Sequence, residues 1–276
     1  MTLINFILNI VGLLLWLNWR AAELPVGGRA GTSLLSTLRP AGPPRPRYYY
    51  WAGLPVLLAA RALFYWQAGQ PVHWSPQISL GPTTLSFRSD LPGRMVLFSV
   101  LSFGVALGVF YLWLLLLSCV NGQGPDAGPV QRLVRVWLGR LERWPGAIKL
   151  LLPLAVAVPA WCLLHPLLAR LNMAPANAPG RLLAQGVVIG LAVYLTLQYL
   201  VIALLILYLL NSYVYLGEFT LWNFVDVTTR RLLRPLQWLP LRARKIDFAP
   251  VLSIILVALA AEFARRGLAR LYQQLL

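Results

Sequence analysis

The sequence predicts an all-α membrane protein with about six transmembrane helices, two interfacial amphipathic helices and a parallel internal repeat. Hydrophobic residues make up 59% of the 276 residues, and the mean hydropathy is +0.68. A soluble domain is only roughly 45 to 50% apolar. The apolar residues gather into runs long enough to cross a bilayer. Basic residues fall mostly between these runs, so lipid is the expected environment of the chain.

The positive charge predicts anionic membrane lipids as partners. The chain has 24 Lys and Arg against eight Asp and Glu, which gives a net charge of +16. Such a balance suits either nucleic acid or anionic headgroups, and the apolar runs favour the headgroups. The two cysteines, Cys119 and Cys162, lack the spacing of a metal or redox motif. We therefore expect no metal, no cofactor and no disulfide framework.

Residues 1–19 predict an N-terminal membrane anchor. The run has the length of a spanning helix, and Trp16 and Trp19 mark the headgroup level at its end. No basic residue precedes the run and no small-x-small pattern follows it. We therefore expect a retained anchor rather than a cleaved signal peptide.

Residues 20–91 predict a linker rich in Pro, Gly and Arg, which by composition forms no core of its own. Two ranges inside it differ from the rest. Residues 51–67 are apolar but contain Pro55 and Arg61, so this range either crosses the membrane or stays on one side. The β-prone residues around Gly81 and Pro82 predict a small hairpin.

Two similar units follow, residues 92–169 and residues 182–272. Each predicts a long apolar helix, a short amphipathic helix and a second apolar helix. The amphipathic helices cover 129–144 and 219–235, where apolar residues recur every three or four positions. The last apolar helix covers 249–263, and we expect it to fray after Phe263.

The two units align without a gap when Val134 is placed on Val225. The same offset brings Arg140 onto Arg231, Arg143 onto Arg234 and Pro159 onto Pro250. These matches fall on the amphipathic helices and on a membrane-entry proline, so apolar composition alone does not explain them. Each unit crosses an even number of times, which predicts two parallel repeats. The first copy is degenerate, because Val156 stands where the second copy has Asp247.

The distribution of Lys and Arg predicts the orientation. With six crossings most basic residues lie on one side, whereas five crossings divide them almost evenly. The positive-inside rule then favours six crossings with both amphipathic helices in the cytoplasm. The expected location is the bacterial cytoplasmic (inner) membrane.

The loop between the last two apolar runs carries a family resemblance. A Thr-x-x-Leu-Leu-Arg-Pro segment is followed by Ile-Asp-Phe-x-Pro. This pattern resembles the signature of the YggT (YlmG) family of small integral membrane proteins. The motif residues are Thr229, Leu232, Leu233, Pro235, Ile246, Asp247, Phe248 and Pro250.

The resemblance covers about residues 95–272 and implies an assembly or scaffold factor. Together with the charge pattern, it predicts a non-enzymatic membrane scaffold that binds anionic lipid and a membrane protein partner, with a second copy of the chain as another candidate partner. Nucleic acid is not expected, and no catalytic residues are identified. The residues expected at lipid or a partner are Arg132, Arg135, Arg140, Arg143, Arg230, Arg231, Arg234, Arg242, Arg244 and Lys245.

The alternative function is a small ion pathway, or its regulator, linked to osmotic tolerance. Asp247 is its candidate residue, because a carboxylate beside a membrane entry requires a partner or water. For Asp247 itself, an ion-paired cap of the last helix is favoured over a proton or cation relay, and a contact with a docked protein is the third alternative. Two GxxxG pairs, Gly104 with Gly108 and Gly186 with Gly190, predict close helix packing within the chain rather than a dimer face.

Overall fold

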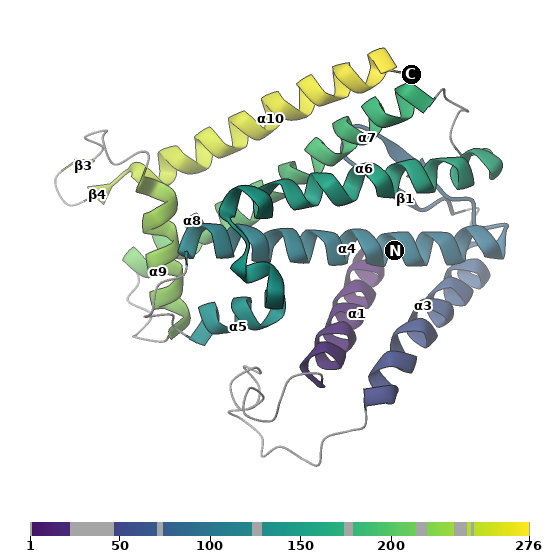
Figure 1. Ribbon diagram of the computed structural model, residues 1–276, viewed down its shortest axis with the longest axis horizontal. Helices are drawn as coiled ribbons and strands as arrows, with labels where there is room; N and C mark the ends of the chain where they lie inside the picture. Colours follow the sequence, from purple (N-terminus) through teal and green to yellow (C-terminus); the bar gives the residue numbers. More distant parts are fainter. Residues whose placement is uncertain are drawn as a thin grey trace. The chain divides into compact units, whose positions relative to one another are not determined.

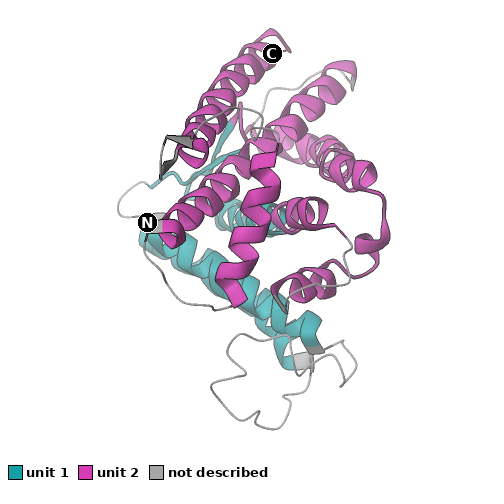
Figure 2. Cartoon of the chain, turned by 90° about the vertical axis from the view of Figure 1, so that its left-hand side faces the viewer, with its two compact units in different colours: residues 1–79, 84–110 teal, residues 80–83, 111–276 magenta. Residues whose placement is uncertain are grey.

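The computed structural model describes residues 2–22, 47–70, 74–122, 129–173, 179–213, 220–234, 242–243 and 246–275. Within these ranges the chain is helical apart from two short β-hairpins and the turns between elements. The predicted all-α class is therefore confirmed. The chain divides into two compact units: unit 1 contains residues 1–79 and 84–110, and unit 2 contains residues 80–83 and 111–276 (Figure 2).

Unit 1 is built on α1 (Thr2–Ala22) and α3 (Arg47–Gly69), which pack along each other (Figure 1). The predicted anchor and the uncertain range 51–67 are thus two helices of one bundle. The buried side chains of α3 follow a helical period, with Arg61, Ala62 and Tyr65 on one face. Pro55 lies inside the helix. The arginine therefore does not stop the helix, because it faces the interior of the bundle.

Two asparagine side chains of α1 accept hydrogen bonds from the buried guanidinium of Arg61. Its guanidinium is 3% exposed, and it donates one hydrogen bond to Asn9 Oδ1 at 2.7 Å and another to Asn5 Oδ1. The amide nitrogens of Asn5 and Asn9 donate in turn to Ser102 Oγ, at 3.3 and 3.2 Å. Ser102 belongs to the first part of α4 (Pro92–Asn121). One chain of hydrogen bonds thus joins α1, α3 and α4, the helices that the structure describes in unit 1.

The predicted hairpin in the linker is confirmed. Strands β1 (Gln77–Ser79) and β2 (Thr84–Ser86) pair antiparallel, and Ile78 lies opposite Leu85 with both side chains buried. Gly81 adopts a φ of +75° in the connecting turn, a conformation that favours glycine.

Four helices among the described residues are long and apolar enough to cross a membrane: Leu3–Ala21, Pro92–Asn121, Gly146–Arg170 and Gly180–Ser212. They fit a membrane-embedded protein. Neither α3 nor α10 (Ala249–Leu275) is among these four. The count of six crossings and the orientation remain predictions.

Unit 2 contains the most extensively packed helix pair, α6 (Gly146–Arg170) with α7 (Pro179–Val193). A Cβ at Gly186 would lie 3.4 Å from the carbonyl oxygen of Val158, and one at Gly190 would lie 2.6 Å from Leu154 Cδ1. This GxxxG pair serves packing within the chain, as expected. The pair on α4 differs, since nothing lies within 4 Å of a Cβ at Gly104 or Gly108.

The predicted order of long, short and long helices is present twice. The first set is α4, α5 (Pro129–Leu138) and α6. The second set is α7 with α8 (Leu197–Tyr213), then α9 (Thr220–Leu233), then α10. A 3₁₀ turn, η2 (Tyr194–Thr196), interrupts the long helix formed by α7 and α8. The offset that aligns the sequences also superimposes the starts of α5 and α9, while the repeat itself stays a prediction.

Two expectations about the C-terminal half are wrong. Helix α10 does not fray after Phe263 but continues to Leu275. Arg266 bonds to Glu262 one turn earlier, and the carbonyl of Leu275 accepts a hydrogen bond from Gln185, so the last turns are supported along their length. The face of α9 predicted from positions 221, 224, 225, 228 and 232 is also partly wrong: Val225 and Thr228 are buried as expected, but Leu221 is 47% exposed and Thr229 and Leu233 are buried instead.

We predict that Asn5→Ala or Asn9→Ala lowers the free energy of unfolding by about 1.5–3 kcal/mol, the contribution of a hydrogen bond to a charged group. Denaturant unfolding of the chain in micelles measures the change. Asn18→Ala on the exposed side of the same helix is the matched control and should have little effect. Equal effects at Asn5, Asn9 and Asn18 would contradict the role of the amides.

Candidate functional site: two basic helices at the end of α4

The first amphipathic helix consists of α5 and the 3₁₀ turn η1 (Gly139–Arg143). Val134 and Leu138 are buried, and Gly139 takes a φ of +56° where the α-helix passes into the tighter turn. The opposite side exposes Arg132, Arg140 and Arg143. The predicted amphipathic character of this segment is confirmed.

The second amphipathic helix, α9, packs against α5. Its inner face consists of Val225, Thr228, Thr229 and Leu233. The motif residue Thr229 is fully buried, and its hydroxyl donates to the carbonyl of Leu204 on α8 at 3.3 Å. Threonines can occupy this buried face because their hydroxyls find acceptors on neighbouring helices.

The last turn of α4 binds both amphipathic helices. Gln131 on α5 donates to the Gly122 carbonyl at 2.8 Å, and Thr228 on α9 donates to Asn121 Oδ1 at 3.1 Å. Arg231 donates to the main-chain carbonyl of Asn121. The final carbonyls of a helix have no partner within it and carry partial negative charge. Side chains from α5 and α9 therefore supply hydrogen-bond donors to the polar groups at the end of α4.

The arginines of the two amphipathic helices that were predicted to bind lipid fall into two groups. Arg231 and Arg135 make bonds inside unit 2: Arg231 with Asn121, and Arg135 with Glu142 at 3.8 Å. Five others project from the exposed surface of the two helices, and we call them the basic platform: Arg132, Arg140, Arg143, Arg230 and Arg234. Arg230 also contacts Asp226 one turn earlier at 3.1 Å.

A buried ion pair lies between the first amphipathic helix and the membrane helices. Lys149 Nζ on α6 donates to Ser118 Oγ at 2.8 Å and to Glu142 Oε2 at 3.4 Å, and Ser118 also donates to Glu142. Lys149 is 4% exposed and Glu142 is 8% exposed.

This pair was not predicted from the sequence. Helix α6 begins at Gly146, three residues before Lys149, and buries the lysine. One signal was available. Glu142 is an isolated acid among arginines, and it precedes by two helical turns a lysine that continues directly into an apolar run. A charge inside such a run requires a partner.

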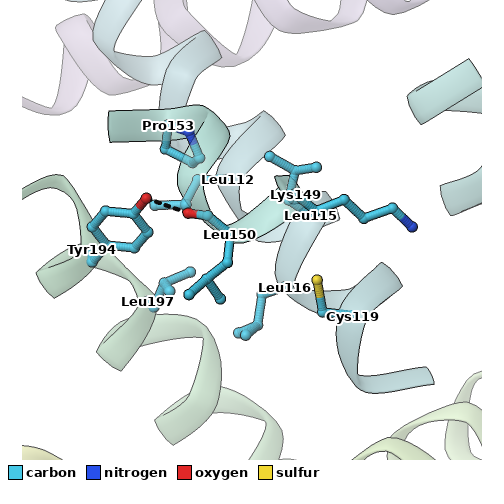
Figure 3. Close-up of a pocket in the computed structure, with 9 residues that line it drawn as sticks. All are labelled: Leu112, Leu115, Leu116, Cys119, Lys149, Leu150, Pro153, Tyr194 and Leu197. Carbon is cyan, nitrogen blue, oxygen red and sulfur yellow. Dashed lines mark hydrogen bonds between the residues drawn. The ribbon is translucent and has the colours of Figure 1, made fainter. Parts of the chain in front are cut away.

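Lys149 also lines a small cavity of about 10 Å³ (Figure 3). Its wall combines Cys119 of α4, Lys149 and Pro153 of α6, and Tyr194 of η2, with leucines between them. The Tyr194 hydroxyl donates to the Leu150 carbonyl, close to the place where Pro153 interrupts the hydrogen bonding of α6 (Figure 3). The volume matches one water molecule, so the cavity itself holds no organic cofactor.

The Ile-Asp-Phe-x-Pro part of the motif leads into α10. Strands β3 (Arg242–Ala243) and β4 (Ile246–Asp247) pair with Arg242 opposite Asp247. Pro250 is buried in the first turn of α10, as expected, and Phe248 is 46% exposed. Pro235, Arg244 and Lys245 lie outside the described residues. The roles predicted for Asp247 remain untested predictions.

Among the described residues, no group of three or more His, Cys, Asp and Glu side chains could hold a metal ion. His165 is buried in α6 and packs edge-on against Trp161, with 5.7 Å between ring centroids.

Comparison of the chain with protein-family models, with curated proteins and with solved structures finds no match. The resemblance to the YggT family is therefore a prediction that rests on the motif residues.

We predict that Lys149→Met lowers the free energy of unfolding by about 3–5 kcal/mol, because it leaves the Glu142 carboxylate buried without its ammonium. Adding Glu142→Leu to this variant should restore most of the loss. A double-mutant cycle in micelles measures the coupling. The exposed pair Glu262 and Arg266, treated in the same way, should show coupling below about 1 kcal/mol. Additive effects of Lys149→Met and Glu142→Leu would contradict the buried pair.

Proposed function

We propose that the protein is an integral membrane scaffold that binds anionic lipid headgroups through the basic platform and positions a membrane protein partner there. One observation carries this proposal. Two short amphipathic helices pack against each other at the end of α4, and both direct arginines outward. An amphipathic helix with arginines on its polar face is the arrangement that lies at a membrane surface.

The charges on the two helices support lipid as the ligand. The two acids in these segments are already in use, since Glu142 pairs with Lys149 and Asp226 pairs with Arg230. Arginine suits phosphate because its planar guanidinium donates two parallel hydrogen bonds. Each basic residue near an anionic surface contributes roughly 1 kcal/mol. The five platform arginines together therefore bind anionic headgroups strongly.

We also propose that the protein resembles the YggT family in function and that the basic platform faces the cytoplasm. A YggT-like scaffold in the bacterial cytoplasmic membrane would present the platform to the cytoplasm, where the inner leaflet is rich in anionic lipid. The motif supports this through Thr229, which holds α9 on α8.

The test compares lipid affinities of the purified full chain for phosphatidylglycerol and phosphatidylcholine, measured by native mass spectrometry from mixed micelles. Replacing Arg132, Arg140 and Arg143 by Gln should weaken phosphatidylglycerol binding by up to about 100-fold, because three contributions of roughly 1 kcal/mol are lost. Binding of phosphatidylcholine should stay unchanged.

The matched control replaces the three exposed arginines of α10, Arg265, Arg266 and Arg270, by Gln, which removes the same charge elsewhere. Its phosphatidylglycerol affinity should remain close to that of the unmodified chain. Equal losses in the two triple variants would show that net charge, and not the platform, binds the lipid.

A further inference from the structure

The cavity that Lys149 lines borders the outer surface of unit 2. Its other walls come from α4, η2 and the start of α8 (Figure 3). Apart from Lys149, Cys119 and Tyr194, the residues that line it are leucines and one proline. Leu150 on its wall is 53% exposed, and Cys119 and Leu197 are half-buried. Since α4, α6 and the long helix of α7 and α8 are candidate membrane spans, acyl chains of the bilayer reach this surface.

Irregular helices form two walls of the cavity. Pro153 has no N–H for the carbonyl four residues earlier, so α6 departs from regular geometry there. The 3₁₀ turn η2 interrupts the long helix formed by α7 and α8. The Tyr194 hydroxyl donates to the carbonyl of Leu150 and thereby joins the two irregular segments. The cavity is therefore held open by backbone features on both sides.

The cavity begins close to the ends of its helices. Cys119 lies in the last turn of α4, and its thiol donates to the carbonyl of Gly146, the first residue of α6, at 3.9 Å. The lining continues along α6 to Pro153, about 10 Å farther at 1.5 Å per residue. For a helix that ends at the membrane surface, this depth covers the headgroup region and the upper part of the acyl chains.

Two arginines of the basic platform lie at the same end of the helices. Glu142 of η1 bonds to Lys149, which lines the cavity, and to Ser118 of α4. Arg140 and Arg143 flank Glu142 in this 3₁₀ turn, and both are exposed. A cationic surface therefore adjoins an apolar cavity. An anionic phospholipid has the matching chemistry, because its phosphate is joined directly to acyl chains.

The size of the cavity favours an acyl chain over a compact ligand. About 10 Å³ is enclosed, which is room for one water-sized or methyl-sized group. Walls made mostly of leucine offer water few hydrogen-bond partners. An acyl chain that lies across the surface places one part of its length in the cavity and covers the exposed Leu150. Van der Waals contact favours such a fit within a bilayer.

We propose that unit 2 binds one anionic diacyl phospholipid at a defined site, with its phosphate at Arg140 and Arg143 and one acyl chain across the cavity lined by Cys119, Leu150 and Pro153. This inference rests on the proposed lipid binding by the basic platform and adds the position of the acyl chain. The arginines select the anionic headgroup, and the cavity fixes the place of the chain beside it.

The two free cysteines provide the test, because both are half-buried but only Cys119 lines the cavity. The purified full chain in mixed micelles reacts with N-ethylmaleimide, and peptide mass spectrometry follows the labelling of each cysteine. At a phosphatidylglycerol concentration ten times its Kd, about nine tenths of the sites are filled, so labelling of Cys119 should slow about tenfold. Labelling of Cys162 should not change. Phosphatidylcholine with the same acyl chains should protect neither cysteine.

Replacing Arg140 and Arg143 by Gln should remove the protection of Cys119, whereas replacing the exposed Arg265 and Arg266 of α10 by Gln should leave it intact. Unslowed labelling of Cys119, while native mass spectrometry detects phosphatidylglycerol on the chain, would overturn this inference and leave the platform proposal standing. Equal protection by phosphatidylcholine would also overturn it, because the chain would then bind without the headgroup. If mass spectrometry detects no bound phosphatidylglycerol, the proposed function fails and this inference fails with it.

Discussion

The hydrogen bonds around Asn121 are the constraint on which the candidate site depends. The last turn of any α-helix leaves several carbonyls without partners inside the helix. In this protein α5 supplies Gln131 and α9 supplies Thr228 and Arg231 to that end. Two short helices from different parts of the chain are therefore fixed at one place. Each of the two helices exposes arginines on the side away from this shared anchor.

Three cations in this protein receive partners of different kinds. Arg61 is bound by two neutral amides, Lys149 is bound by a carboxylate and a serine, and Arg231 is bound at a helix end. The kind of partner depends on the side chain and on its surroundings. An arginine can be solvated by several oxygens because its guanidinium carries five donors, whereas a lysine in an apolar run is best matched by a nearby acid. The platform arginines, by contrast, remain on the surface.

The helices and their amphipathic faces could be predicted from the sequence because a 3.6-residue period and long apolar runs are local signals. The partners of the buried charges could not. Nothing local in α1 shows that Asn5 and Asn9 meet Arg61, since the contact spans more than 50 residues. The burial of Thr229 on α9 was missed for a related reason: its hydroxyl donates to the distant carbonyl of Leu204, and apolar periodicity does not indicate such a bond.

The neighbours Arg230 and Arg231 allow the most direct test of the anchor at α4. Both residues are exposed, but Arg231 donates to Asn121 at the end of α4, whereas Arg230 contacts Asp226 within its own helix. Hydrogen exchange of the α9 backbone amides should accelerate in Arg231→Ala and stay close to the unmodified rate in Arg230→Ala. Equal exchange rates in the two variants would show that the end of α4 does not hold α9 in place.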